Sequence, residues 1–313
     1  MTAEGQYPED SDVSGYTKVW STLITNTKYL EGLLTLNFSL KKAGSKYPLV
    51  ALYTKQLDPN SVKAICKRGI SVIQIDPLIP TKSKQFGHDS RFYDTWSKLQ
   101  PFKLVQFERV IQLDSDMVVI RNMDELMDFD LAPHIAFAAA AACVCNPLKL
   151  DHYPGNWVPK NCSFTNYHAK LASTVGHDHQ DHHIRGPAAH LGLGLCNGGL
   201  LIVRPDTQNY ATILETLSKP EKTASYDFPD QELLADVFRN RWVALSYKYN
   251  CLKTLKKCHS DIWNMDEIKN IHYIITPKPW EVSRESFHDE TDTFEFWWAT
   301  NDERLEAEKL DNI

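Results

Sequence analysis

The fold of this chain is decided by residues 109–116, RVIQLDSD. The first five residues form an apolar run with β-branched side chains, which predicts a buried strand. Asp114 and Asp116 follow at once, one residue apart, where that strand would end. Two carboxylates placed in this way can hold one divalent cation, and such cations commonly bind substrate phosphates as well. Asp-x-Asp is also common in turns, so the pair alone fits either a metal site or solvated loop charges.

Strand and helix patterns alternate on the N-terminal side of this stretch. Residues 18–24, 48–53 and 70–75 resemble strands, and a helical pattern follows each of them. This alternation predicts an α/β fold with a mostly parallel sheet flanked by helices. Ligands of open α/β sheets bind beyond the carboxyl ends of the strands, where Asn26 and the acidic pair fall. The predicted helices span 27–43, 59–69, 94–107, 206–218 and 229–238, and further strands span 135–142, 199–203, 241–245 and 271–275.

The chain is expected to form one domain over residues 16–300, with a large insertion over 143–195. Residues 1–15 are polar and acidic and predict a disordered leader. Residues 301–313 are rich in charge and predict a C-terminal surface helix or tail. No internal repeat and no low-complexity linker divides the sequence.

The composition argues against several classes of partner. The 313 residues include 34 basic and 40 acidic ones, a net charge of −6, so neither nucleic acid nor an anionic membrane is an expected partner. The seven cysteines lack the spacing of a disulfide framework, which favours a reducing compartment. The sequence has no signal-peptide pattern and no apolar stretch long enough to span a bilayer, so we expect a cytoplasmic protein.

Six short motifs occur in a fixed order along the chain. They are LITNTKY at 23–29, WSKL at 96–99, DSD at 114–116, CNGG at 196–199, DFPDQ at 227–231, and His272 followed by KPW at 278–280. Together they resemble glycosyltransferase family 8, the group of glycogenin and galactinol synthase. The resemblance covers roughly residues 17–120, 196–204 and 227–280. It implies the Rossmann-like GT-A fold, which binds nucleotide-sugars.

The resemblance implies a site for a metal and a diphosphate. Asp114, Asp116 and His272 would hold the metal, and their mixed ligation favours Mn²⁺, with Mg²⁺ as the alternative. Lys278 would bring a positive charge to the diphosphate. Charge develops on that group as a sugar leaves, and a metal and a cation stabilise it. On local grounds alone, His272 could also be a histidine satisfied by a partner within a strand.

The resemblance also implies which side chains contact a UDP-sugar. Asn26 can read the uracil edge because its amide both donates and accepts, and Tyr29 can stack on the base. Lys98 and Arg91 match cations near the donor sugar and phosphates. On local grounds Thr25 or Asn26 could instead cap a helix. The implied donor contacts are Leu23, Thr25, Asn26, Tyr29, Arg91, Lys98, Asp114, Ser115, Asn197, Gly198, Gly199, Asp227 and Lys278.

The implied catalytic residues are Asp230, Gln231 and Lys278. Asp230 and Gln231 match the family residues nearest the reacting carbon. Retention of configuration needs either a covalent intermediate on a carboxylate or amide, or attack from the leaving-group face, and the residues do not choose between these. Acidic residues also favour helix N-termini, so Asp230 could serve only there.

Two departures from glycogenin bear on the acceptor and on the donor pocket. Glycogenin carries its acceptor tyrosine after a Tyr-Asn pair, which Tyr249 and Asn250 match, but residues 251–271 contain no tyrosine. We therefore expect a separate glycan or polyol acceptor and no self-glucosylation at that place. Ile275 and Glu232 stand where glycogenin has glycines, which leaves the shape of the phosphate and sugar contacts open.

The insertion holds three cysteines and a histidine cluster. Cys143, Cys145 and Cys162, with the His-rich residues 177–183, allow a zinc site, although their spacing is not that of common zinc motifs. A solvated loop is a second interpretation. A third, which we favour, is a lid on the acceptor side, since long loops in compact domains are often functional. Trp157 or Tyr153 would then offer a sugar-stacking face.

The sequence as a whole predicts a UDP-sugar-dependent hexosyltransferase, with UDP-glucose or UDP-galactose as the leading donor, acting as a monomer or a homodimer. One alternative is a regulatory protein that binds nucleotide-sugars without transfer. Another is a nucleotidyltransferase, but such enzymes usually have a glycine-rich phosphate loop after the first strand, and residues 25–28 contain no glycine.

Overall fold

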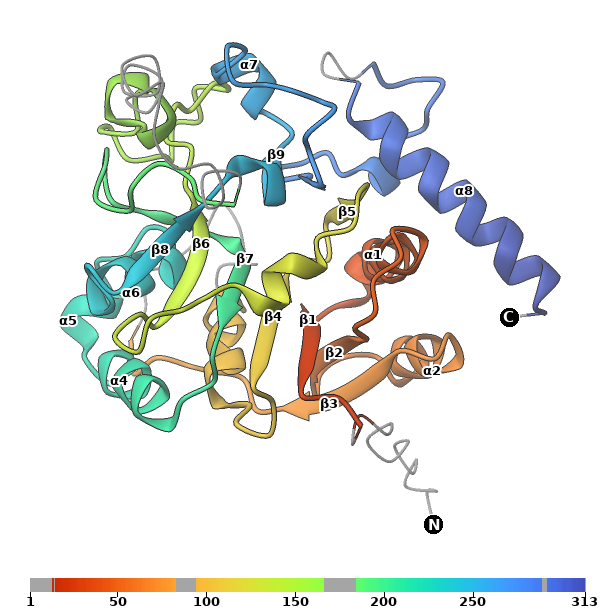
Figure 1. Ribbon diagram of the computed structural model, residues 1–313, viewed down its shortest axis with the longest axis horizontal. Helices are drawn as coiled ribbons and strands as arrows, with labels where there is room; N and C mark the ends of the chain where they lie inside the picture. Colours follow the sequence, from red (N-terminus) through yellow and green to blue (C-terminus); the bar gives the residue numbers. More distant parts are fainter. Residues whose placement is uncertain (1–12, 14, 83–93, 166–183, 289–291, 313) are drawn as a thin grey trace.

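The computed structural model describes residues 13, 15–82, 94–165, 184–288 and 292–312. A seven-stranded sheet runs through the molecule in the order β3-β2-β1-β4-β7-β6-β8 (Figure 1). β7 is antiparallel to β4 and β6, and all other neighbours are parallel, so the predicted mostly parallel sheet is confirmed. The strands are β1 Lys18–Ile24, β2 Leu49–Thr54, β3 Ser71–Ile75, β4 Arg109–Leu113, β6 Phe137–Ala141, β7 Cys196–Val203 and β8 Trp242–Leu245.

Helices flank this sheet, as the alternating pattern predicts. α1 and α2 lie beside β1 to β3, and α8 packs against α1 on its outer side, whereas α4, α5 and α6 gather beside β6 to β8 (Figure 1). Two of them begin at an aspartate that caps backbone N–H groups: Asp58 accepts from Asn60, and Asp206 accepts from Asn209. The α-helices are α1 Leu30–Lys42, α2 Pro59–Lys67, α4 Thr207–Leu217, α5 Pro220–Thr223, α6 Pro229–Val237, α7 Leu255–Cys258 and α8 Phe294–Leu310.

Three predicted elements differ from the observed ones. The segment expected as a helix over 94–107 is a 3₁₀ helix, η3 Thr95–Lys103, and contains Pro101, which has no N–H for an α-helical hydrogen bond. The strand expected over 271–275 ends at His272, before Ile275 adopts a positive φ of 61°. The helix expected over 301–313 is longer than predicted and begins at Phe294, which is buried.

A second, three-stranded sheet brings His272 to the acidic pair. Its order is β5-β10-β9, and β10 pairs antiparallel with β5 so that His272 lies opposite Met117. The amide of Tyr273 donates to the carbonyl of Asp116 at 2.9 Å. This pairing therefore joins segments some 150 residues apart along the chain at the carboxyl end of β4. The strands are β5 Met117–Val119, β9 Cys251–Leu252 and β10 Asn270–His272.

Helix α8 is attached to α1 and α2 by buried charge. Arg304 is only 2% exposed and donates to Glu31 of α1 and to Glu308 one turn later on α8. Arg68, at the end of α2, donates through two nitrogens to the same Glu308. The C-terminal residues are thus part of the packed body. Among the described residues, no helix is long and apolar enough to cross a membrane.

Replacing Arg304 by methionine is expected to destabilise the protein by about 2 kcal/mol, because Glu308 loses one of its two arginine partners and keeps only Arg68. The free energy of unfolding from urea titration measures this. Arg284→Met is the matched control, since Arg284 is 42% exposed and its ion pairs with Glu295 and Asp302 should be worth no more than about 1 kcal/mol. Equal losses in the two variants would contradict this assignment.

Candidate active site

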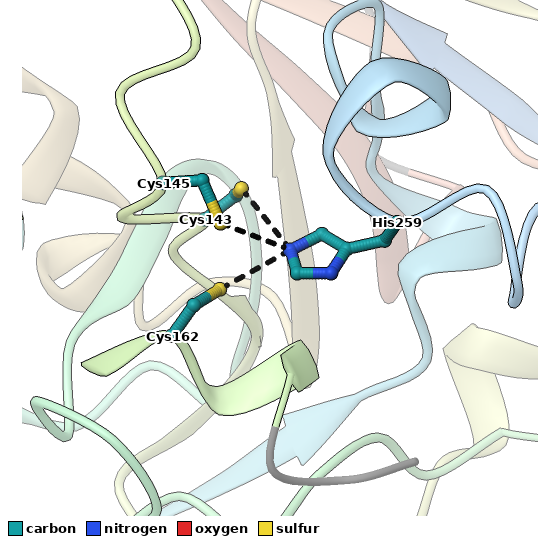
Figure 2. Close-up of side chains that lie close together, drawn as sticks. All are labelled: Cys143, Cys145, Cys162 and His259. Atoms are coloured by element: carbon teal, nitrogen blue, oxygen red, sulfur yellow. Dashed lines mark hydrogen bonds between the residues drawn. The ribbon is translucent and has the colours of Figure 1, made fainter. Parts of the chain in front are cut away.

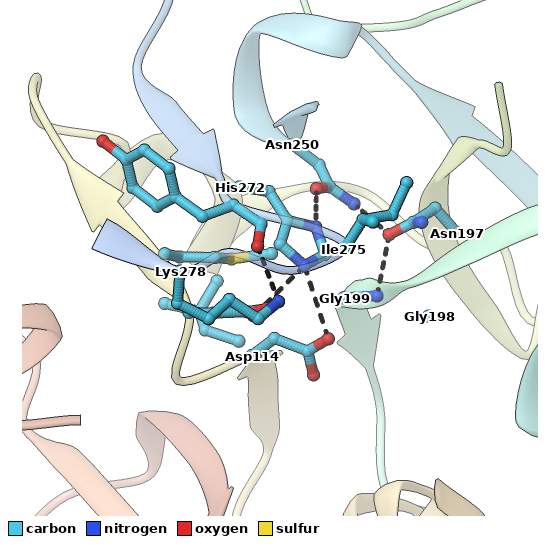
Figure 3. Close-up of polar contacts among 12 residues, drawn as sticks. Asp114, Asn197, Gly198, Gly199, Asn250, His272, Ile275 and Lys278 are labelled. Atoms are coloured by element: carbon cyan, nitrogen blue, oxygen red, sulfur yellow. Dashed lines mark hydrogen bonds and ion pairs between the residues drawn. The ribbon is translucent and has the colours of Figure 1, made fainter. Parts of the chain in front are cut away.

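Asp114, Asp116 and His272 meet at the end of β4, as the sequence predicts. Nε2 of His272 lies 3.2 Å from Oδ1 of Asp116 and 3.6 Å from Oδ2 of Asp114 (Figure 3). One ligand atom of each residue lies within 4.8 Å of the others. Asp116 and His272 are buried. Two carboxylate oxygens and one imidazole nitrogen at this spacing fit a divalent metal ion such as Mn²⁺.

The orientation of His272 supports its role as a ligand. Nδ1 of His272 lies 2.8 Å from Oδ1 of Asn250, whose amide nitrogen donates to Oδ1 of Asn197 at 2.8 Å (Figure 3). Because that second bond orients the Asn250 amide so that its oxygen faces Nδ1 of His272, Nε2 is the ring nitrogen left to act as a ligand when a metal is bound. The sequence matched Asn250 to a family position but gave it no role, because its partner depends on how β9 and β10 pair.

Each aspartate also has a lysine partner. Nζ of Lys278 donates to Oδ2 of Asp116 and to the carbonyl of Tyr273, both at 2.6 Å. Nζ of Lys98 donates to Oδ2 of Asp114 at 2.7 Å. Lys278 is 1% exposed, so its ammonium depends on these partners for compensation of its charge. Lys98 is likewise held in an ion pair with Asp114 and is only partly exposed to solvent.

The electrostatics of this group keep it charged. Burial alone would raise the pKa of Asp116, but Lys278 and His272 outweigh it and hold the pKa well below its usual range. Burial alone would lower the pKa of Lys98, but attraction by Asp114 and Asp230 outweighs it and raises that pKa. Asp116 is therefore an ionised carboxylate at neutral pH, and Lys98 is an ionised ammonium group.

Asn197, Gly198 and Gly199 let the backbone of β7 approach the site closely. A Cβ on Gly198 would lie 2.2 Å from Oδ2 of Asp230, and a Cβ on Gly199 would lie 2.3 Å from Cε1 of His272. The side-chain oxygen Oε1 of Gln231 accepts from the amide of Gly198 at 3.0 Å. The close approach at these glycines is thus made to side chains of the site itself.

Asp230 and Gln231 lie in the first turn of α6, next to this stretch of β7. Burial raises the pKa of Asp230, and the nearby Lys98 only partly offsets that effect. Oε2 of Glu232 accepts from the amides of Asp227 and Phe228. Glu232, which stands where glycogenin has a glycine, therefore caps backbone amides at the N-terminus of α6, the helix that carries Asp230.

The residues expected around a nucleotide lie between β1 and α1. Oδ1 of Asn26 accepts from the amide of Lys28 at 3.1 Å. In this structure Asn26 therefore caps a helix, which is the alternative interpretation of this residue. Thr25 donates to Asp94 at 2.8 Å. The ring of Tyr29 is 6.0 Å from Nζ of Lys278. The residues expected around the nucleotide therefore lie next to the lysine that contacts Asp116. Leu23 is half-buried in β1, and Arg91 lies outside the described residues.

Ile275 and Gly32 show further constraints on the site. Ile275 has a φ of 61°, a backbone conformation that strongly favours glycine and that a β-branched residue rarely adopts. A Cβ on Gly32 would lie 2.4 Å from the carbonyl oxygen of Ser115, so α1 packs directly against the acidic loop. Gly32 belongs to none of the six motifs, and its only signal in the sequence is a glycine within a predicted helix.

Comparison with known proteins agrees with this geometry. The sequence profile described as glycosyl transferase family 8 matches residues 22–283. Galactinol synthase 2 of Arabidopsis thaliana is 25% identical over 97% of this chain and 87% of its own length. The structure of the bifunctional glycosyltransferase WbbM has a TM-score of 0.61 at 16% identity, over 93% of this chain and 50% of that one. The galactosyltransferase LgtC, solved with donor and acceptor sugar analogues, has a TM-score of 0.56 at 16% identity, over 91% of this chain and 96% of that one.

The structural likenesses establish the fold, which is the GT-A fold that the motifs imply. The family match rests on a profile that spans most of the 313 residues and all six motifs. It includes Asp114, Asp116 and His272, the glycine pair of β7 and the turn that carries Asp230. The chain therefore belongs to glycosyltransferase family 8.

Proposed function

We propose that this protein is a metal-dependent, retaining hexosyltransferase that uses a UDP-sugar and a separate glycan or polyol acceptor. UDP-glucose and UDP-galactose are the leading donors. The observation that carries the proposal is the convergence of Asp114, Asp116 and His272 with two lysine contacts, a buried one from Lys278 and a half-buried one from Lys98. The family match supports transfer of a glycosyl group, and the relatives named galactinol synthases support a donor of the galactose type.

The reaction breaks the bond between the anomeric carbon and a diphosphate oxygen and forms a bond to an acceptor oxygen, which loses its proton. Asp114, Asp116 and His272 would hold Mn²⁺ or Mg²⁺. When bound, the metal supplies positive charge that offsets the charge developing on the departing diphosphate. Lys278 has three N–H donors, of which two engage Asp116 and Tyr273, and its charge would stabilise the same diphosphate.

Asp230 and Gln231 would face the reacting carbon. Gln231 is held by the amide of Gly198, and Asp230 is held against the same glycine, so both side chains have fixed positions. Fixed polar groups of this kind stabilise a transition state without reorganising during the reaction. Lys98, which attracts both Asp114 and Asp230, would position these two carboxylates relative to each other.

A donor panel tests the proposal. UDP-glucose, UDP-galactose and UDP-N-acetylglucosamine are incubated with the protein and Mn²⁺ or Mg²⁺, and released UDP is measured with and without polyols. We expect slow metal-dependent hydrolysis of one UDP-hexose, faster turnover with an acceptor, and an unchanged intact mass of the protein. Hexose additions to the protein would contradict the separate acceptor.

Two other outcomes would identify the alternatives. Saturable UDP-sugar binding without any turnover would indicate a regulatory binding protein. Formation of pyrophosphate from UTP and a sugar phosphate would indicate a nucleotidyltransferase. Metal-independent hydrolysis would contradict the assignment of Asp114, Asp116 and His272 as metal ligands.

A further inference from the structure

A second cluster of potential metal ligands lies away from the active site. Nε2 of His259 is 3.6 Å from Sγ of Cys143, 3.3 Å from Sγ of Cys145 and 3.4 Å from Sγ of Cys162 (Figure 2). The four ligand atoms all lie within 4.8 Å of one another. The two first cysteines follow β6, Cys162 follows the 3₁₀ helix η5 Pro159–Asn161, and His259 follows α7. None of the four belongs to the proposed UDP-sugar site.

Hydrogen bonding does not account for this arrangement. One ring nitrogen carries either a single proton or a single lone pair, so Nε2 of His259 can make one good hydrogen bond and not three. In a tetrahedral zinc site, bonds of about 2.3 Å to sulfur and about 2.0 Å to nitrogen place each sulfur about 3.5 Å from the nitrogen. The observed separations match the edges of such a tetrahedron.

The surroundings of the cluster are those of a structural metal site. Cys162 is fully buried, and Cys145 and His259 are nearly so. Cys145 and Cys162 belong to a hydrophobic core cluster that also contains Trp157 and Phe164, and the ring of Phe164 lies 5.6 Å from that of His259. Four protein ligands complete a tetrahedron and leave no position for a substrate, which is the pattern of structural rather than catalytic zinc. All seven cysteines of the chain are free in this structure, so no disulfide competes for these thiols.

We propose that Cys143, Cys145, Cys162 and His259 bind one structural Zn²⁺. The sequence raised zinc with the histidines of residues 177–183 and ranked it below a lid, but those histidines lie outside the described residues. The fourth ligand is instead His259, 97 residues beyond Cys162. This site does not depend on the proposed hexosyltransferase activity.

The zinc would connect the insertion to the segment that delivers His272. Cys143, Cys145 and Cys162 fix the first part of the insertion, and His259 precedes β10 by a short loop. Trp157, between these cysteines, stacks on Phe228 with ring centroids 4.3 Å apart, next to the turn that carries Asp230. We therefore expect the described part of the insertion to be a metal-stabilised wall of the site, in place of the acceptor-side lid that the sequence favoured.

Metal analysis of the full chain tests this proposal. Protein purified without chelators and without a histidine tag should contain about one zinc per chain, and Asp116→Asn should retain it because that variant affects only the other site. Cys162→Ser and His259→Ala should lose it. Cys66→Ser is the matched control, since Cys66 lies on α2 and is not a ligand, and Cys258→Ser should also retain zinc.

Cobalt substitution keeps the test decisive if a ligand variant does not fold. Wild-type protein refilled with Co²⁺ should show sulfur-to-cobalt charge-transfer absorption, which the Asp114, Asp116 and His272 site cannot give because it contains no thiolate. Absence of zinc and of this absorption in the wild type would overturn the proposal, as would a disulfide among these cysteines by mass spectrometry. Loss of zinc in Cys258→Ser would overturn the assignment of the four ligands.

Discussion

Replacing Asp116 by asparagine is expected to lower kcat/KM for the UDP-sugar by about 10³-fold, the loss seen when one preorganised charge-stabilising group is removed. Oδ1 of Asp116 faces His272 at 3.2 Å, and Oδ2 accepts from Lys278 at 2.6 Å. The amide that replaces the carboxylate has no charge and presents N–H donors to groups that need an acceptor. Both the metal ligand and the partner of Lys278 are therefore lost in one substitution.

The variant should still fold, so that the loss of activity can be measured. Asp128→Asn is the matched control, because Asp128 is 70% exposed, pairs only with Lys18 at the surface among its described contacts, and should leave turnover within about twofold of the wild type. Mn²⁺ titration by calorimetry should show weakened binding in Asp116→Asn alone. Turnover of Asp116→Asn within tenfold of the wild type would remove the main support for the proposed metal site.

The acid dependence of stability gives an independent check on the same residue. The pKa of Asp116 is lowered in the folded protein, so its ionised form contributes stability at pH values above the unfolded pKa of about 3.9 and loses it as pH falls through the folded pKa. The difference in unfolding free energy between wild type and Asp116→Asn, measured in EDTA, should therefore shrink as the pH is lowered below about 4. A difference that grows on acidification would contradict this sign.

The parts of the fold that the sequence predicted are those set by local pattern. The apolar runs of β1 to β4 fixed the strands, and Asp114 and Asp116 were placed correctly because they directly follow one of them. His272 was assigned only from the order of the motifs. Its closeness to Asp114 and Asp116 depends on the pairing of β5 with β10, which no local pattern reveals.

Features that depend on contacts between distant segments could not be predicted in the same way. His259 lies 97 to 116 residues from the cysteines that surround it, and no local spacing links them. Asn250 acts through the orientation of an amide, which needs both Asn197 and His272 in place. A glycine is required at position 32 because a Cβ there would lie 2.4 Å from the carbonyl oxygen of Ser115, which belongs to a separate loop. In each case the chemistry resides in a tertiary contact and not in a run of residues.

Replacing Gly199 by alanine is expected to destabilise the protein by about 2 kcal/mol, the range for overpacking a well-packed interior, and to weaken metal binding as well. The new methyl carbon would lie 2.3 Å from Cε1 and 2.7 Å from Nδ1 of His272, and 2.9 Å from Cε of Met117. No left-handed φ applies at Gly199, so the requirement is for space and not for backbone freedom.

His272 cannot move away from that methyl group without losing its own contacts. Its Nδ1 is bonded to Asn250, its Nε2 faces both carboxylates, and its backbone is paired with β5 and β9. Disturbing the groups that orient a metal-bound histidine typically costs about 10- to 100-fold in metal affinity or activity. We therefore expect kcat/KM to fall by about 10²-fold. The melting temperature and a Mn²⁺ titration measure the two effects separately.

Two glycine variants separate crowding of His272 from a general effect of alanine. Gly155→Ala is the control for alanine itself, because nothing lies within 4 Å of a Cβ there, and stability should change by less than about 0.5 kcal/mol. Gly198→Ala would crowd Oδ2 of Asp230 at 2.2 Å, and should lower turnover while leaving Mn²⁺ affinity near that of the wild type. If Gly199→Ala instead bound Mn²⁺ normally, His272 would not be the ligand that its position beside Asp114 and Asp116 indicates. The contrast between the two neighbouring glycines thus distinguishes the metal-holding side of the site from the side that faces the transferred sugar.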